Sequence, residues 1–161
     1  MQKSRQISLY VTIALWAIII GGVVYSHIVY FPAYLGNLPQ SNQLITGANG
    51  LHEENFWMFI HPFAIVLTIT TLILNWKLKQ RRKFILIAAV IYALAIYFTA
   101  IYFVPELIAF SKSTDPASAA ELYERGQTWQ HRSWIRGSFL FLGFIMLLVA
   151  FEKDKRVGVA V

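Results

Sequence analysis

Five ionisable side chains lie inside or beside the long apolar stretches of this 161-residue sequence: His27, His61, Glu106, His131 and Arg136. If the four stretches are successive helices that cross a membrane, their direction alternates and all five side chains return to the same side. Ionisable groups at membrane depth are costly, so by default they mark a functional site. Four helices that each bring a polar group to a common level form the geometry of a ligand site in a helical bundle. The sequence therefore predicts a polar site at the outer-leaflet end of such a bundle.

The apolar stretches have the length and composition of membrane-spanning helices. Hydrophobic residues make up 57% of the chain and charged residues 14%, and the mean hydropathy is +0.54, which is too apolar for an ordinary soluble domain. A spanning helix needs about 20 apolar residues, and each stretch reaches this length. We therefore predict an all-α fold, an integral membrane antiparallel four-helix bundle, with residues 1–161 in a single transmembrane domain. Its helices are expected at about residues 7–30, 56–76, 84–110 and 116–151.

The placement of charge predicts how the bundle is oriented. Ten of the 14 Lys and Arg residues lie in the N-terminus, in the connection 77–83 and in the C-terminal tail. The positive-inside rule then puts both termini in the cytoplasm, as expected for a protein of the bacterial inner membrane. Attraction to membrane lipid explains the basic excess, and no nucleic acid is required. The absence of cysteine excludes disulfides, thiolate-held Fe–S clusters and thiolate haem ligands.

Two polar connections are expected on the outer side. The first, at about residues 33–55, is long and contains several Gly and Pro residues, so we predict a lid over the outer mouth of the bundle. The second contains Ser113, Thr114 and Asp115 as N-cap candidates before Pro116. Proline suits the first helical position, so the fourth helix is expected to begin near Pro116.

His61 is the strongest single candidate for chemistry. It is followed by Pro62, which leaves a backbone carbonyl without its helical partner. Glu54 and Trp57 precede His61 by seven and four residues, which places them on the same helix face. We predict that His61 is a general base or metal ligand and that Glu54 orients or assists it. The alternative is a histidine that only hydrogen-bonds a neighbouring helix.

Arg136 lies inside the last apolar stretch, about two turns past Trp129. A guanidinium there needs a carboxylate partner or an anionic ligand. We predict Glu106 as the first partner and Glu54 as the second. Arg136 would otherwise grip a substrate oxyanion or a haem propionate.

Other candidates have side chains that bind metals or haem. His27, His61, His131 and Glu106 come from separate helices and would supply ligands for iron, copper or zinc, although no helix carries the paired spacing of di-iron bundles. Two facing histidines would hold haem instead, and Arg132 joins His27, His61 and His131 in the predicted cofactor-binding set. Judged singly, His27 and His131 are typical of interfacial histidines and Glu106 of a carboxylate at headgroup level, so these alternatives stay open.

Three segments resemble the anthrone-oxygenase-like family of small four-helix membrane proteins. They are FPAYLGNLP at 31–39, VPE at 104–106, and DPASAAELYERGQTWQHRSWIR at 115–136. The last is most similar to the family, because Trp129 is followed seven residues later by Arg136. The order of these features covers most of the chain.

The resemblance implies an activity as well as a fold. Members of the family in fungi oxidise anthrones to anthraquinones with dioxygen, and many other members have no known function. This chain departs from the family at two positions: His61–Pro62 stands where an Asn-Pro is common, and Trp134 where a histidine precedes the arginine. His61 is therefore expected to be a local specialisation.

These features lead to one main hypothesis and one alternative. The main hypothesis is a membrane oxidoreductase or oxygenase that acts on an apolar aromatic or quinone-like small molecule. In it, His61 is the base or metal ligand and Arg136 clamps the substrate oxygen. The supporting residues are Glu54, Glu106, His27 and His131. The alternative is a non-enzymatic haem- or metal-binding subunit, acting as an oligomer or within a larger complex.

Overall fold

The computed structural model describes residues 2–113, 115 and 119–155, and the part of the chain that it describes contains helices and no strand. Four long helices are joined by shorter helical segments. The long helices are α1 (Gln2–Tyr25), α4 (Glu53–Leu74), α5 (Lys79–Phe98) and α7 (Ala119–Lys155). The short segments are η1 (Ser26–Tyr30), α2 (Phe31–Leu35), η2 (Gln40–Asn42), α3 (Gln43–Thr46), η3 (Thr99–Phe103) and α6 (Val104–Lys112). The all-α prediction is confirmed.

Four helical stretches are long and apolar enough to cross a membrane: Gln2–Leu35, Glu53–Leu74, Lys79–Lys112 and Ala119–Lys153. They overlap the four predicted helices over most of their length and are longer at most ends, because helical backbone continues through polar residues that an apolar pattern does not include. The second is the exception, because it ends at Leu74 and not at residue 76 as predicted. The predicted start at Pro116, with its cap candidate Thr114, lies outside the described residues.

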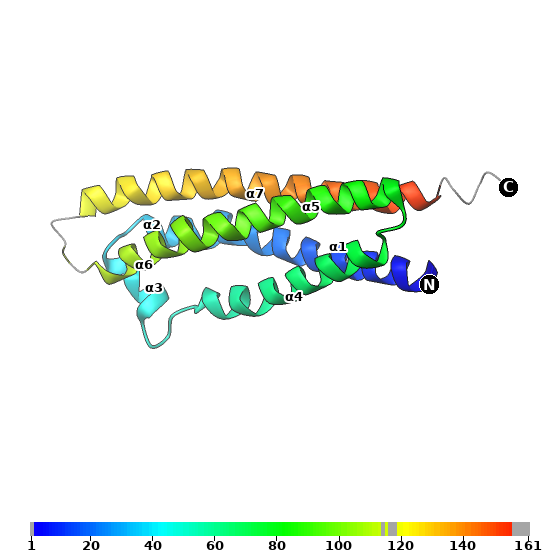
Figure 1. The fold of residues 1–161 in the computed structure, drawn as a ribbon. Helices are drawn as coiled ribbons and strands as arrows, with labels where there is room; N and C mark the ends of the chain where they lie inside the picture. The colour runs from blue at the N-terminus through cyan, green and yellow to red at the C-terminus, as the bar shows by residue number, and fades with distance from the viewer. Residues whose placement is uncertain (1, 114, 116–118, 156–161) are drawn as a thin grey trace.

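The long helices lie along one another (Figure 1). The start of α1, the end of α7 and the connection between α4 and α5 are at one end of the molecule, here called the end near the termini, and α2, α3 and α6 are at the other. α5 packs chiefly against α7, while α4 packs chiefly against α1. The predicted lid region is folded into α2, η2 and α3 at the end opposite the termini.

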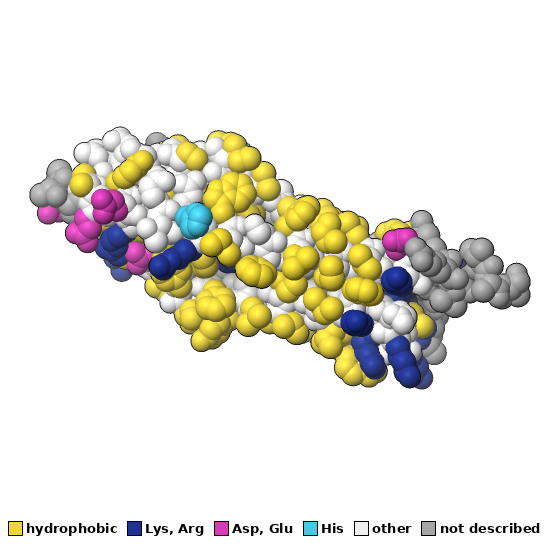
Figure 2. Space-filling view, turned by 90° about the horizontal axis from the view of Figure 1, so that it is seen from above, with side chains coloured by type: hydrophobic (Ala, Val, Ile, Leu, Met, Phe, Trp, Pro, Cys, Tyr) yellow, Lys and Arg dark blue, Asp and Glu magenta, His cyan; other side chains and the backbone are white. Residues whose placement is uncertain are grey.

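The surface between the two ends is apolar. Figure 2 shows hydrophobic side chains over the middle of the molecule, with mainly Lys and Arg at one end and a mixture of acidic and basic side chains at the other. Large hydrophobic side chains of the long helices are strongly exposed, such as Met58 at 68% and Phe59 at 69% on α4. A soluble monomer rarely exposes so large an apolar surface.

Close helix contacts in the interior depend on small residues. Trp16 is fully buried, and a Cβ on Gly143 would lie 2.7 Å from its Cζ3 atom, so α7 approaches α1 only because position 143 has no side chain. A second buried cluster, nearer the end with α2 and α6, contains Tyr34, Phe110 and Trp129.

Two π-helical turns interrupt the first and third of the four apolar helical stretches. In η1 the Phe31 N–H bonds the Ser26 carbonyl, and in η3 the Val104 N–H bonds the Thr99 carbonyl, each five residues back. A proline, Pro32 or Pro105, lies in the first turn of the helix that follows each of them. Isolated π turns inside α-helices are frequent at functional sites.

Candidate functional site

Arg136 lies partly buried on α7, facing η3. Its Nη1 donates to the Thr99 hydroxyl oxygen at 2.5 Å and its Nη2 donates to the Ser133 hydroxyl oxygen at 3.0 Å. The Thr99 hydroxyl in turn donates to the Ala95 carbonyl, which leaves its lone pairs for the guanidinium. The guanidinium carbon is 4.3 Å from the centre of the Phe103 ring. Among the described residues no carboxylate pairs with Arg136, and its buried Nε has no hydrogen-bond partner.

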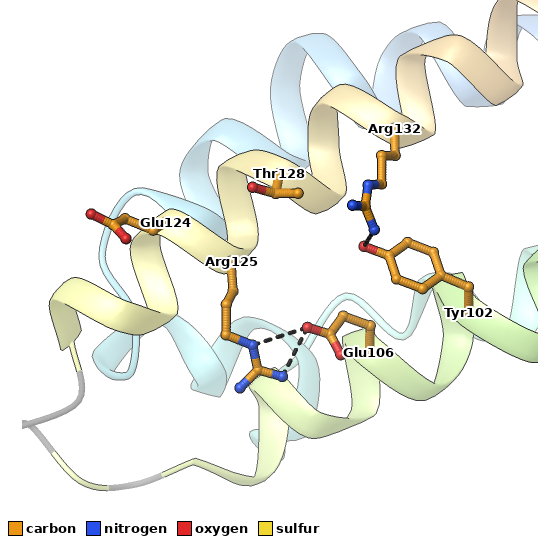
Figure 3. A pocket seen from close by; sticks show the side chains of 6 residues that line it. All are labelled: Tyr102, Glu106, Glu124, Arg125, Thr128 and Arg132. Atoms are coloured by element: carbon orange, nitrogen blue, oxygen red, sulfur yellow. Dashed lines mark hydrogen bonds and ion pairs between the residues drawn. The ribbon is translucent and has the colours of Figure 1, made fainter.

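The predicted ion pairs of Arg136 are therefore wrong. Glu106 Oε1 accepts from Nε and Nη2 of Arg125, at 3.0 and 2.8 Å (Figure 3). Glu54 instead contacts His52 Nδ1, at 3.0 Å. Arg125 precedes Arg136 by 11 residues, or about 16 Å along a helix, and Glu106 lies in α6 beyond η3, level with the earlier arginine. Glu106 is thus too near the end of the bundle to reach the Arg136 guanidinium, and Glu54 is occupied by His52.

His27 lies in the π turn η1 and is 3% exposed. Its Nδ1 donates to the Val23 carbonyl at 2.7 Å, and its ring packs against Trp134 and Phe31 with centroids 4.5 and 5.4 Å apart. With Nδ1 as donor, the Nε2 of the neutral ring is an acceptor. This Nε2 is buried and makes no hydrogen bond within the described chain. His27 and His61 both lie within electrostatic range of Arg136.

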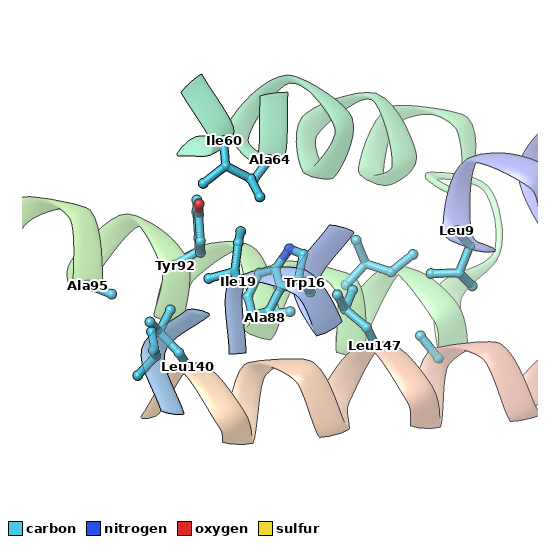
Figure 4. Packing of buried hydrophobic residues seen from close by; sticks show 13 residues of the cluster. Leu9, Trp16, Ile19, Ile60, Ala64, Ala88, Tyr92, Ala95, Leu140 and Leu147 are labelled. Atoms are coloured by element: carbon cyan, nitrogen blue, oxygen red, sulfur yellow. The ribbon is translucent and has the colours of Figure 1, made fainter. Parts of the chain in front are cut away.

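His61 is hydrogen-bonded to a neighbouring helix. Its Nδ1 is 2.7 Å from the hydroxyl of Tyr92 on α5, and Trp57 stacks on its ring with centroids 5.4 Å apart. Figure 4 shows the Tyr92 hydroxyl pointing from α5 towards α4, while its ring lies beside Trp16. The predicted support from Glu54 is wrong, because that carboxylate contacts His52. This hydrogen bond is the contact expected of a histidine that bonds a neighbouring helix, which is the alternative prediction for His61. That His61 also acts as a base or metal ligand stays a prediction.

Three residues of this region are not predicted as site residues, because no sequence pattern distinguishes them from their neighbours. Tyr92 and Thr99 are ordinary members of an apolar stretch. Glu53, next to the predicted Glu54, is the acidic residue that turns inwards: the Ser26 hydroxyl donates to its Oε1. Adjacent helical residues point about 100° apart, so one carboxylate faces α1 and the other faces outwards.

The predicted metal ligands are not brought together. Within the residues that the structure describes, no group of three or more His, Cys, Asp or Glu side chains is placed to hold a metal ion. His131 is exposed on α7, whereas His27 is buried and Glu106 is held by Arg125. Arg132, from the predicted cofactor set, is also exposed and donates to the Tyr102 hydroxyl at 3.0 Å.

Two hollows accompany these residues. An open pocket of about 370 Å³ at the end with α6 is lined by Tyr102, Glu106, Glu124, Arg125, Thr128 and Arg132 (Figure 3). An apolar groove of about 360 Å³ runs between α4 and α5 and is lined by Ile65, Thr68, Ile69, Ala89, Tyr92, Ala93, Ile96 and Tyr97. The groove thus reaches the hydroxyl-bearing residue that contacts His61. No protein-family model, curated protein or solved structure matches the chain.

Proposed function

We propose that this chain is an integral protein of the bacterial inner membrane, folded as an antiparallel four-helix bundle with both termini in the cytoplasm. The four apolar helices and the apolar middle surface support insertion. The concentration of Lys and Arg near the termini and between α4 and α5 supports the orientation. Reporter fusions at residues 80 and 120 are expected to lie in opposite compartments. A reporter at residue 80 outside the cell would contradict this orientation.

The functional proposal depends on one observation, the environment of the Arg136 guanidinium. A cation in the apolar part of a span costs roughly 2.5–3.5 kcal/mol on insertion scales. Hydroxyls and a ring surround it, with no carboxylate among the described residues, and its Nε is without a partner. A buried donor left unsatisfied adds a further cost. An oxygen of a bound ligand that carries negative charge would offset both costs.

We propose that Arg136, His27 and His61, here called the Arg136 cluster, bind an apolar aromatic or quinone-like molecule through its oxygen and oxidise it. Aromatic side chains surround the cluster: Phe103 lies under Arg136, Trp134 beside His27, and Trp57 on His61. Such a site suits a flat apolar ligand with one polar atom. The groove between α4 and α5 gives a molecule dissolved in the membrane a route to Tyr92.

The resemblance to anthrone oxygenases suggests the reaction. His27 Nε2 takes a proton from the methylene carbon opposite the carbonyl of an anthrone, and Arg136 stabilises the resulting enolate oxygen. The carbanionic carbon bonds to dioxygen, and the distal oxygen of the peroxide takes the proton back. Breaking the O–O bond and removing the remaining hydrogen releases water and leaves the second carbonyl. One anthrone and one dioxygen give one anthraquinone and one water, so the four electrons from the methylene carbon reduce dioxygen fully.

Oxidation of anthrone by the purified protein tests this proposal. Dioxygen uptake and anthraquinone absorbance should rise together in a 1:1 ratio, above the rate without protein. Arg136→Met should reduce the rate to the protein-free level, whereas His131→Ala, an exposed change on the same helix, should leave it intact. No rate above the protein-free level with anthrones or quinols, or an unchanged rate in Arg136→Met, would overturn the proposal.

An absorption spectrum with metal analysis separates the enzyme from the alternative of a haem- or metal-binding subunit. A Soret band would indicate haem. Stoichiometric metal that is lost in His61→Ala or His27→Ala would indicate a metal site built on those histidines. Either result without substrate oxidation would favour the non-enzymatic role.

A further inference from the structure

The open pocket at the α6 end has two walls, each made by a pair of side chains (Figure 3). Arg125 and Glu106 form one wall through two hydrogen bonds. Arg132 and Tyr102 form the other, with the Arg132 guanidinium carbon 5.2 Å from the Tyr102 ring centre. Thr128 lies on α7 between the two arginines, so a ligand in the pocket would meet both cations and a hydroxyl.

Three side chains that line this pocket have hydrogen-bond donors or acceptors without a partner among the described residues: Arg132, Thr128 and Glu124. Arg132 has five N–H donors, of which one is used, to Tyr102. Thr128 and Glu124 form no side-chain hydrogen bond or ion pair with another described residue. Arginine forks match phosphate oxygens, and a carboxylate pairs with an ammonium group. The pocket can therefore donate to an anion and accept from a cation at the same time.

The charge balance of the lining selects among ligands. The lining contains two guanidinium groups and two carboxylates, so its formal charge is zero. A purely anionic ligand would be attracted by Arg132 but repelled by Glu106 and Glu124. A zwitterion with a phosphate and an amine satisfies both signs, because its phosphate lies against Arg132 and its ammonium against a carboxylate.

The position of the pocket indicates where such a zwitterion would come from. It lies where the candidate spans Lys79–Lys112 and Ala119–Lys153 have their ends, away from the apolar middle surface. In the proposed membrane placement, on which this inference rests, that is the level of the lipid headgroups. We propose that the pocket binds the phosphoethanolamine headgroup of a membrane phospholipid.

Native mass spectrometry of delipidated, detergent-purified full-length protein tests the proposal. Phosphatidylethanolamine and phosphatidylglycerol with the same acyl chains are titrated separately, and the lipid-bound fraction is measured. Phosphatidylethanolamine should bind better, and Arg132→Gln should weaken it about tenfold, as expected for loss of one charge-assisted contact. Arg82→Gln is the matched control, because Arg82 also lies over an aromatic ring, Trp76 at 4.9 Å, but at the opposite end.

A second variant keeps the proposal testable even if Arg132→Gln disturbs the fold. Glu106→Gln removes an ammonium partner, so it should lower the preference for phosphatidylethanolamine over phosphatidylglycerol without abolishing lipid binding. Equal binding of the two lipids, or binding unchanged in both variants, would overturn the proposal. If free phosphoethanolamine displaces bound phosphatidylethanolamine as well as the lipid itself does, the ligand need not be a lipid, and that part of the proposal fails. If inorganic phosphate alone displaces it, the pocket recognises a phosphate and not a zwitterion. Lipid binding is measured without substrate, so its failure is distinguishable from failure of the proposed oxidation.

Discussion

Arg125 and Arg136 lie on the same helix but in opposite circumstances. The Arg125 side chain is 41% exposed, and it has a carboxylate from Glu106 at 2.8 Å and a second, Glu121, at 4.0 Å. Arg136 is deeper in the bundle and has two hydroxyls and a ring. Arg125, whose charge solvent already screens, has two carboxylates nearby. Arg136, whose charge is less screened, has no carboxylate partner among the described residues. This difference is expected if Arg125 is held in place by carboxylates at the rim of the bundle while Arg136 is kept for a ligand inside it.

The largest expected effect comes from removing the charge of Arg136. Arg136→Met should lower the rate of anthrone oxidation by about 100-fold or more, the scale seen when one donor to a developing oxyanion is lost. Arg136→Lys should lose most of the rate too, because the planar fork is lost although the charge stays. Arg125→Met is the control at the rim and should keep the rate. A retained rate in Arg136→Met would mean that the two arginines do not differ in function.

Arg136→Met should not lower thermal stability, although it lowers the rate of oxidation. Replacing a buried, poorly partnered charge by an apolar side chain of similar size is often neutral or stabilising. The thermal unfolding midpoint of Arg136→Met in detergent should therefore be equal to or above that of the wild type. A clear fall would show that the guanidinium stabilises the fold through contacts with its hydroxyl partners.

Thr99→Val tests the hydroxyl partner of Arg136 directly. The change conserves shape but leaves the guanidinium without the oxygen that its Nη1 contacts. Hydrogen bonds to charged groups contribute about 1.5–3 kcal/mol, so unfolding free energy should fall by roughly that amount. Thr99→Ser keeps the hydroxyl and should lose much less. Equal losses in the two variants would assign the effect to packing of the methyl group.

A glycine follows each arginine and permits a matched comparison of the two sites. A Cβ on Gly137 would lie 3.1 Å from Val23 Cγ1, and a Cβ on Gly126 would lie 3.0 Å from Leu35 Cδ2. Alanine gains helix propensity of about 1 kcal/mol over glycine, and crowding opposes this gain, so both variants should change unfolding free energy by about 1 kcal/mol or less. Only Gly137→Ala moves α7 relative to the turn before His27, so only it should reduce substrate oxidation. Equal activity in both variants would show that the Arg136 cluster tolerates such a shift.

The sequence predicts the helices well and the contacts between them poorly. Apolar length alone locates four helices, because each stretch is long enough to be a span. It does not locate Glu106 relative to Arg136, because the axial register of two helices depends on packing and on the π turn η3, which has no distinct sequence pattern. Nor does it separate Glu53 from Glu54, since a stretch that is apolar on every face has no polar face to indicate which side turns inwards. Tyr92 is found only when the structure brings it to His61.

The smallest expected effect concerns the ion pair at the rim. Arg125 donates two hydrogen bonds to Glu106, but exposed ion pairs stabilise by only about 0–1 kcal/mol because solvent and salt screen them. A double-mutant cycle with Arg125→Met and Glu106→Gln, measured by unfolding in detergent, should give a coupling in that range that shrinks as salt is raised. Thr99→Val and Arg136→Met should give a coupling of about 1.5 kcal/mol or more, with less dependence on salt, because that contact is partly buried. If the coupling between Arg125 and Glu106 were as large and as independent of salt as that between Arg136 and Thr99, solvent exposure would not explain the difference between the two arginines.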